Sequence, residues 1–176
     1  MSGSDIQAIR ARAKGANINE QTLLATDYLN HFNEAMMLIE LVPDMPECVA
    51  DLAEWEPISY EEHFRRSNFS ARDLAIEAYR AAPARYRKPF DAAIARLGTL
   101  IQATIEGASA MIACENTAAA AEIVHLAMPA IRRYQETAGA IINGADVVID
   151  HDDIIEDITA EENTLDQSAI DSLMKA

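Results

Sequence analysis

Residues 89–113 read PFDAAIARLGTLIQATIEGASAMIA, and this stretch decides the fold. Its large apolar side chains recur every three or four residues, which is the spacing of one face of an α-helix. A turn at Glu115-Asn116-Thr117 follows, and the Thr117 hydroxyl can cap a second helix over 118–142. The apolar positions are Phe90, Ile94, Leu97, Ile101, Ile105, Ala108 and Ile112, then Ile123, Leu126, Ala130, Tyr134 and Ile141. The sequence therefore predicts two long helices joined as an antiparallel hairpin, whose apolar stripe is also compatible with a homodimer.

The segments before the hairpin are also predicted to be helical. The chain has only six glycines and six prolines and is rich in alanine, which favours helices over strands. An apolar stripe predicts a helix over 19–42, which Pro43 ends. Shorter helical pieces are expected over 48–55 and 60–66, and a further helix capped by Ser70. The predicted fold class is all-α, a helical bundle with a long C-terminal helical hairpin and a disordered acidic tail.

Four parts are expected to follow one another along the chain. Residues 1–18 have little apolar periodicity and are predicted to be a flexible arm, and 19–144 form the helical bundle domain. Residues 145–163 carry eight acidic side chains and no lysine or arginine, so they are expected to be an extended, self-repelling linker. Residues 164–176 are amphipathic again. A short amphipathic end on an acidic leash is typical of a peptide that folds into a partner's groove.

Composition excludes several classes of protein. The chain has 176 residues, half of them hydrophobic, and a formal net charge of −15. Such a chain is a poor nucleic-acid binder, because phosphate contacts need a positive face. No apolar run reaches the ~18–20 residues that span a bilayer, so no membrane association is expected. The N-terminus lacks the apolar stretch of a secretory signal, and the two cysteines are too few for a disulfide framework. The expected location is the cytoplasm.

Charge and metal-ligand spacing add two further expectations. Residues 20–64 carry eleven acidic and no basic side chains, whereas 65–96 carry eight basic and three acidic ones. We expect these two stretches to neutralise each other through short-range pairs; the alternative is that the basic residues hold the acidic linker. The pair Glu122 and His125 has the spacing of a four-helix metal site but no second copy. No metal and no cofactor are therefore expected in this chain.

The C-terminal residues 167–174 read QSAIDSLM, which is the pattern Q-x-x-[IV]-D-x-L-[LM]. This pattern resembles the C-terminal segment with which the CheZ family of chemotaxis phosphatases holds the response regulator CheY. It resembles more loosely the N-terminal segment of the flagellar switch protein FliM. The resemblance implies a CheY-like receiver domain as partner, with Mg²⁺ only on that receiver. The docking residues that it implies are Leu165, Gln167, Ile170, Asp171, Leu173 and Met174.

A second stretch, residues 134–142, reads YQETAGAII and resembles the catalytic stretch of the CheZ family. In that family an acid and a glutamine four residues later act together, and the glutamine amide orients the water that attacks the aspartyl phosphate. The resemblance makes Glu136 the acid and Gln135 a second site candidate. Ala140 stands at the glutamine position, and a methyl group cannot hold a water. By the family's chemistry this site is inactive unless the amide comes from elsewhere in the chain.

A substitute amide can come from the predicted first helix. Hydrolysis of an aspartyl phosphate needs a positioned water and compensation of the phosphoryl charge more than a covalent catalyst. Asp27 and Asn30 lie three residues apart, which places a carboxylate and a carboxamide on one face of a helix. His31 and Glu34 belong to the same polar cluster. The ordinary interpretation of this cluster is a solvated helix face with local pairs; the alternative is a site that positions a water.

These features predict a chemotaxis or two-component regulator that binds a CheY-like response regulator through its C-terminal peptide and promotes its dephosphorylation. The catalytic candidates are Glu136, Gln135, Asp27 and Asn30. One alternative is a non-catalytic adaptor or sequestering protein for a receiver domain. A further alternative is a plain helical protein-interaction module. The enzyme and the adaptor share the C-terminal peptide, so only turnover separates them.

Overall fold

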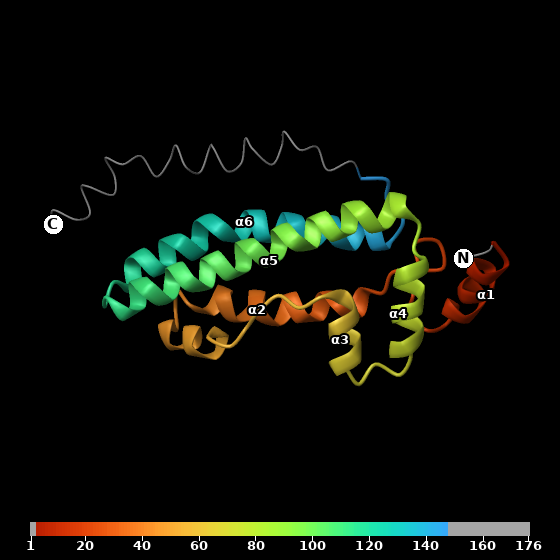
Figure 1. Cartoon of the computed structure of the whole chain (residues 1–176). Helices are drawn as coiled ribbons and strands as arrows, with labels where there is room; N and C mark the ends of the chain where they lie inside the picture. Colours follow the sequence, from red (N-terminus) through yellow and green to blue (C-terminus); the bar gives the residue numbers. More distant parts are fainter. Residues whose placement is uncertain (1–2, 148–176) are drawn as a thin grey trace.

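The computed structural model describes residues 3–147, and within them the chain is helical and has no β-strand (Figure 1). This confirms the predicted all-α class. The predicted linker from residue 148 onward and the predicted peptide 164–176 lie outside the described residues. The elements are α1 (Gly3–Ala13), the 3₁₀ helix η1 (Thr26–Leu29), α2 (Asn30–Leu41), the 3₁₀ helix η2 (Pro46–Leu52), α3 (Tyr60–Arg66), α4 (Arg72–Ala81), α5 (Ala84–Ala113) and α6 (Thr117–Ile142).

Helices α5 and α6 form the predicted antiparallel hairpin and lie side by side (Figure 1). Phe90, Leu97 and Ile101 of α5 are buried, as is Ile131 of α6. Of the predicted inward positions of α6, Tyr134 and Ile141 are buried. Ile123 and Ala130 are only half-buried, and Leu126 is 57% exposed on the outer face of α6. The hairpin therefore buries most of the predicted stripe of α5 and a stripe of α6 that is shifted from the predicted one, with α2 packed along it.

The helix caps differ in detail from the predicted ones. The Asn116 carboxamide oxygen accepts a hydrogen bond from the Ala119 N–H at 3.1 Å and caps α6, which is the role predicted for Thr117. Helix α4 begins at Arg72 without a side-chain cap, although Ser70 was predicted to supply one. Such short-range details shift a helix boundary by one or two residues and leave the packing unchanged.

The predicted helix over 19–42 is wrong in its first part. Residues before Thr26 form a tight loop, because the Asn19 side-chain oxygen accepts hydrogen bonds from the N–H groups of Gln21 and Thr22 at 2.8 and 3.0 Å. Asparagine competes with helix formation by such local bonds. Leu23 has φ 61, outside the helical region, and is fully buried. The loop thus buries apolar side chains that a helix would carry on its stripe.

The prediction of a flexible arm over residues 1–18 is also wrong, because most of this stretch is helical. Residues 3–13 form α1, which packs against α4. Ile9 and Ala13 are buried at this contact, and Arg12 forms an ion pair with Glu77 at 2.8 Å. A helix that buries one isoleucine and one alanine has almost no periodic signal, which is why its sequence resembles a coil.

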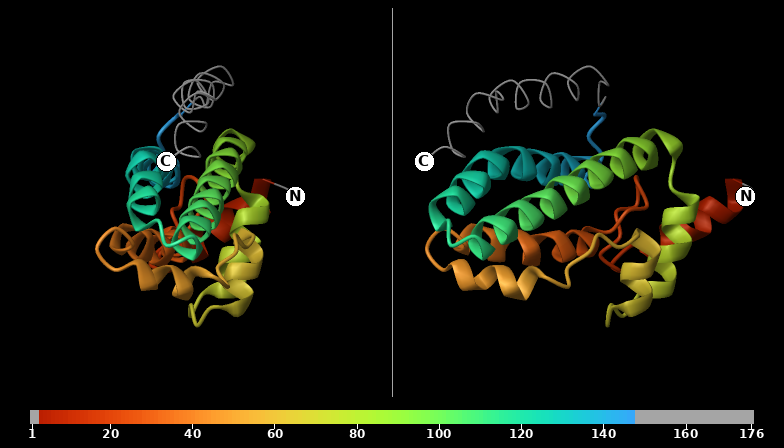
Figure 2. Two further views of the ribbon diagram at one scale, coloured as in Figure 1. Left: turned by 90° about the vertical axis from the view of Figure 1, so that its left-hand side faces the viewer. Right: turned by 60° about the vertical axis from the view of Figure 1, so that its left-hand side comes forward.

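Helix α2 lies along the hairpin and contacts both of its helices (Figure 1). The 3₁₀ helix η2 packs on α2 and α5, while α1, α3 and α4 gather at the opposite end of the molecule (Figure 2). An aromatic cluster joins these parts. The Tyr28 ring centroid lies 5.0 Å from that of Tyr60 and 6.1 Å from that of Phe90. The core therefore connects η1, α3 and α5 through three rings.

The C-terminal end of α6 closes with a glycine cap. Gly144 has φ 93, its N–H donates to the Ile141 carbonyl, and the Ala145 N–H donates to the Ala140 carbonyl. This pair of bonds is the Schellman motif. A side chain at Gly144 would also lie 3.1 Å from the Gln21 side-chain oxygen. Both the backbone conformation and the space at this position require glycine.

Replacing Gly144 by alanine is expected to lower the free energy of unfolding by about 1–2 kcal/mol, because an L-residue is strained in the left-handed region. Urea unfolding followed by circular dichroism measures the change. Gly139→Ala is the matched control, since Gly139 lies inside α6 with only an ordinary 3.8 Å contact to Leu29. Alanine is the better helix former there, so the control is expected to be neutral or stabilising. Equal losses in both variants would contradict the cap assignment.

Replacing Tyr60 by phenylalanine is expected to cost about 1–3 kcal/mol, because it leaves a buried N–H without an acceptor. The Tyr60 hydroxyl accepts from the Ala25 N–H at 2.8 Å, and both residues are buried. Tyr134→Phe, at the edge of the hairpin, is the control for loss of a hydroxyl. Thermal unfolding of the three proteins measures the difference. Two variants of equal stability would show that the Tyr60 bond does not hold the 19–25 loop.

Candidate functional site

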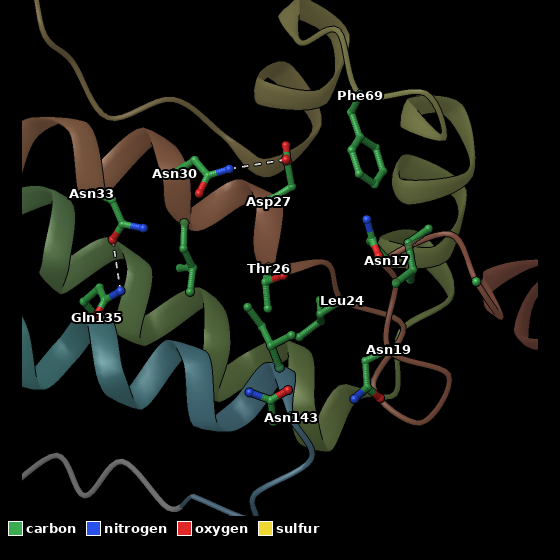
Figure 3. Close-up of a pocket in the computed structure, with 14 residues that line it drawn as sticks. Asn17, Asn19, Leu24, Thr26, Asp27, Asn30, Asn33, Phe69, Gln135 and Asn143 are labelled. Carbon is green, nitrogen blue, oxygen red and sulfur yellow. Dashed lines mark hydrogen bonds between the residues drawn. The ribbon is translucent and has the colours of Figure 1, made fainter.

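A cavity of about 580 Å³ lies where the loop before η1, the start of α2 and the end of α6 meet (Figure 3). Its floor includes the apolar side chains of Leu24 and Leu29, with Phe69 at one side. No lysine, arginine or histidine lines it. Its polar lining consists of a carboxylate, a hydroxyl and six carboxamides: Asp27, Thr26, Asn17, Asn19, Asn30, Asn33, Gln135 and Asn143.

Asp27 is held in place from two sides. One of its carboxylate oxygens accepts a hydrogen bond from the Asn30 amide at 3.3 Å, and the other lies 3.1 Å from Nε2 of His63. Asp27 lies in η1 and His63 in α3, so this contact joins segments that are 36 residues apart in the sequence. The Asp27–Asn30 pair predicted from the sequence therefore forms, with a histidine behind it.

A second carboxamide pair crosses from α2 to α6. The Gln135 amide donates to the Asn33 side-chain oxygen at 3.0 Å (Figure 3). Asn33 is one turn of α2 beyond Asn30, so both amide pairs line the same cavity. The structure thus brings together three of the four catalytic candidates, Asp27, Asn30 and Gln135.

Glu136, the fourth candidate, does not line the cavity. A helix turns by about 100° per residue, so Glu136 points away from its neighbour Gln135 and is exposed on the outer face of α6. Ala140, one turn further on, is exposed on the same face. The stretch that resembles the CheZ catalytic stretch therefore contributes one side chain to the cavity and one to the solvent face.

His31 and Glu34, the other members of the predicted polar cluster, do not line the cavity either. The His31 ring stacks on Trp55 with centroids 5.1 Å apart, and its Nε2 lies 2.8 Å from the Glu56 carbonyl oxygen. Burial lowers the pKa of His31 below its ordinary value, and the bond to the Glu56 carbonyl opposes that effect. His31 is a packing residue between α2 and the segment that follows η2.

Sequence reasoning missed four of the carboxamides, Asn17, Asn19, Asn33 and Asn143. Asn17 has φ 55 and Asn19 anchors the turn, so both have a local structural role that asparagine commonly plays. Asn143 follows the last residue of α6 and donates its side-chain amide to the Gly139 carbonyl. Each is unremarkable in the sequence. Only the tertiary structure shows that these four residues line the same cavity.

The arrangement defines the chemistry of the cavity. A carboxamide both donates and accepts hydrogen bonds, whereas a carboxylate accepts them. A site with six carboxamides, one carboxylate and no cationic side chain can hold water and polar uncharged groups. It lacks the positive charge that would bind a phosphate by itself. An anion that reacts in this cavity therefore needs a positive charge that is supplied by the molecule to which the anion is attached.

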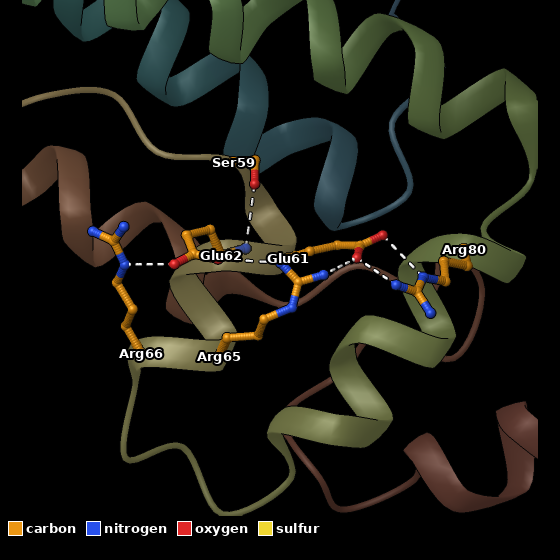
Figure 4. A network of polar contacts seen from close by, with 6 residues as sticks. All are labelled: Ser59, Glu61, Glu62, Arg65, Arg66 and Arg80. Atoms are coloured by element: carbon orange, nitrogen blue, oxygen red, sulfur yellow. Dashed lines mark hydrogen bonds and ion pairs between the residues drawn. The ribbon is translucent and has the colours of Figure 1, made fainter.

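Three of the eight basic residues of the stretch 65–96 form ion pairs with acidic side chains of the stretch 20–64. Arg80 and Arg65 bind Glu61 at 2.5 and 2.6 Å, and Arg66 binds Glu62 at 2.7 Å (Figure 4). The bond from Arg80 holds the pKa of Glu61 below its usual range. All three arginines are exposed, so each pair contributes little to stability on its own.

Two further surveys of residues 3–147 bear on the type of site. No group of three or more histidine, cysteine, aspartate or glutamate side chains in this part of the chain could hold a metal ion. None of the described helices is long and apolar enough to cross a membrane. The predicted docking residues of the C-terminal peptide lie beyond residue 147, outside the described residues.

Comparison of the chain with protein-family models, with curated proteins and with solved structures finds no match.

Glu61→Gln is expected to lower the melting temperature slightly at pH 7, because it removes the acceptor shared by Arg65 and Arg80. The folded-state pKa of Glu61 is depressed, so its contribution is present above the unfolded pKa and is lost as pH falls through the folded pKa. Thermal unfolding measured from pH 7 to pH 3 should show the difference between the two proteins vanishing below the usual glutamate range. Glu54→Gln, an exposed carboxylate outside this network, is the control. A difference that persists at pH 3 would contradict the ion-pair origin.

Proposed function

We propose that the chain regulates a CheY-like receiver domain, which it binds through residues 164–176 and whose aspartyl phosphate it helps to hydrolyse. In this proposal Asp27, Asn30 and Gln135 orient the attacking water. The observation that carries the proposal is that these three candidates, chosen from two separate segments of the sequence, line one cavity. The docking half of the proposal rests on the pattern QSAIDSLM.

The chemistry of the reaction fits the composition of the cavity. Water attacks phosphorus in line, an O–P bond forms, and the bond from phosphorus to the receiver's aspartate breaks. The products are inorganic phosphate and a free carboxylate, and a water proton is released. The receiver supplies Mg²⁺ and thereby the positive charge, so a helper site needs only groups that orient water. Carboxamides and one carboxylate without a cation meet that need.

A second candidate is a receiver-binding adaptor that does not hydrolyse the phosphate. One observation favours it. In the resemblance to the CheZ family, the catalytic acid and glutamine belong to one helix stretch, and here that face of α6 presents Glu136 and Ala140 to solvent. This face has the acid and lacks the amide. The two candidates share the docking peptide and differ only in turnover.

The test measures the lifetime of a phosphorylated CheY-like receiver from the same organism, with and without the full chain. The wild-type chain is expected to shorten the lifetime, and Gln135→Ala and Asp27→Asn are each expected to lose about tenfold or more of that effect. Gln102→Ala, an exposed carboxamide on α5 outside the cavity, is the matched control and should behave as wild type.

Binding is measured in parallel by titrating the receiver. The double variant Ile170→Ala/Leu173→Ala is expected to lose binding, whereas Ser172→Ala, at an unspecified position of the pattern, is expected to retain it. Tail-dependent binding without a shortened lifetime would establish the adaptor. Absence of binding by the wild-type chain would refute both receiver-based functions and leave a plain helical interaction module.

A further inference from the structure

A second cavity, of about 500 Å³, lies between α2 and α6 and is here called the α2–α6 groove. Its apolar lining consists of Pro43, Val124, Met128 and Pro129. Its polar lining is Glu40, His125 and Arg132, and an ion pair of 2.8 Å between Arg132 and Glu40 bridges the two helices. It contains none of the residues of the carboxamide-lined cavity.

The exposed large apolar side chains are neighbours in sequence of residues that line this groove. Met37 is 67% exposed, and Leu41 and Met45 are each 40% exposed. Met37 and Leu41 flank Glu40 on α2, and Met45 follows Pro43 in the loop after that helix. Leu126, on the outer face of α6, is the other large apolar side chain exposed among residues 3–147. A concentration of apolar surface at a groove marks a docking site.

We propose that this groove is the resting seat of the chain's own C-terminal segment, residues 164–176, which leaves it when a partner takes the segment. That this partner is a receiver domain rests on the proposed function. The docking of the segment in the groove does not rest on it. Docking on the chain's own body would make the segment unavailable to the partner for part of the time, and so regulate binding.

The tether is long enough to reach the groove. The described chain ends at Val147, and 17 residues separate it from Leu165. At about 3.3 Å per residue they span up to ~56 Å when extended. Met128 lies 14 residues before the end of α6 at Ile142, which is about 21 Å along a helix. A tether of this length holds its end at an effective concentration on the order of 1 mM.

The segment also complements the groove in chemistry. On a helix Ile170, Leu173 and Met174 lie within an arc of about 100°, which suits a floor of valine, methionine and proline. Its acidic residues can pair with Arg132 and Lys175 can pair with Glu40, in exchange for the Arg132–Glu40 ion pair. The apolar residues of the segment are Leu165, Ile170, Leu173 and Met174, and the acidic ones are Asp166 and Asp171.

The test uses the full chain with ¹³C-labelled methionine methyl groups and needs no receiver. The methyl signals of Met37 and Met128 are expected to differ between wild type and the variant Ile170→Asp/Leu173→Asp. The signal of Met111, which lies on α5 and does not line the groove, is expected to stay unchanged, and Ser172→Ala should match wild type. A synthetic peptide of residues 164–176 at about 1 mM should shift the same two signals of the double variant back toward wild type.

Receiver titration then separates the seat from the proposed function. Met37→Glu places an acid beside the groove at an exposed position and is expected to free the segment and tighten receiver binding about three- to tenfold. If the methyl signals of Met37 and Met128 change with the tail variant but neither the wild-type chain nor Met37→Glu binds a receiver, docking in the groove is supported and the proposed function fails. If those methyl signals do not respond to the tail variant, the seat is refuted whatever the receiver does. Signals that change with protein concentration as the mass doubles would instead show a second copy in the groove, and would also refute it.

Discussion

The packing of Tyr28, Tyr60 and Phe90 is the contact on which the rest of the structure depends. It joins η1, α3 and α5, none of which is adjacent to another in the sequence. The Tyr60 hydroxyl also accepts a hydrogen bond from the Ala25 N–H, and the Tyr28 hydroxyl donates one to the Ile58 carbonyl. Burial raises the pKa of both tyrosines far above the physiological range. The cluster therefore stays neutral and keeps the loop before η1 in a fixed position.

That fixed loop determines the geometry of the carboxamide-lined cavity. The Thr22 hydroxyl donates to the Ile142 carbonyl at 2.8 Å and ties the loop to the end of α6. Gln21 bonds to the Tyr86 hydroxyl at the start of α5. Because one side of the cavity comes from the loop and η1 and the other from α6, these contacts set the distance between Asp27 and Gln135. The site is thus a product of loop anchoring more than of helix packing.

Much of this fold could be predicted from the sequence, and the limits have physical causes. The long α5–α6 hairpin has a strong 3.6-residue apolar period over two segments, so its helices and turn were predictable. Helix α1 and the 19–25 loop were not, because one follows from a few small side chains and the other from the local bonds of Asn19. The Asp27–Asn30 pair could be predicted since it depends on spacing within one segment. That this pair lines the same cavity as Gln135 depends on tertiary packing, which no local pattern specifies.

The glycine cap of α6 has a consequence for kinetics. Gly144 fixes the point at which the chain leaves the body, and Asn143, its neighbour, lines the carboxamide-lined cavity. Anything that the C-terminal segment holds is therefore tethered at the mouth of that cavity. Encounter between the two would be a unimolecular step, first order in the complex and independent of dilution once the segment is saturated. Inserting residues between positions 147 and 164 would slow that step, whereas changes at the hairpin turn would leave it unaltered.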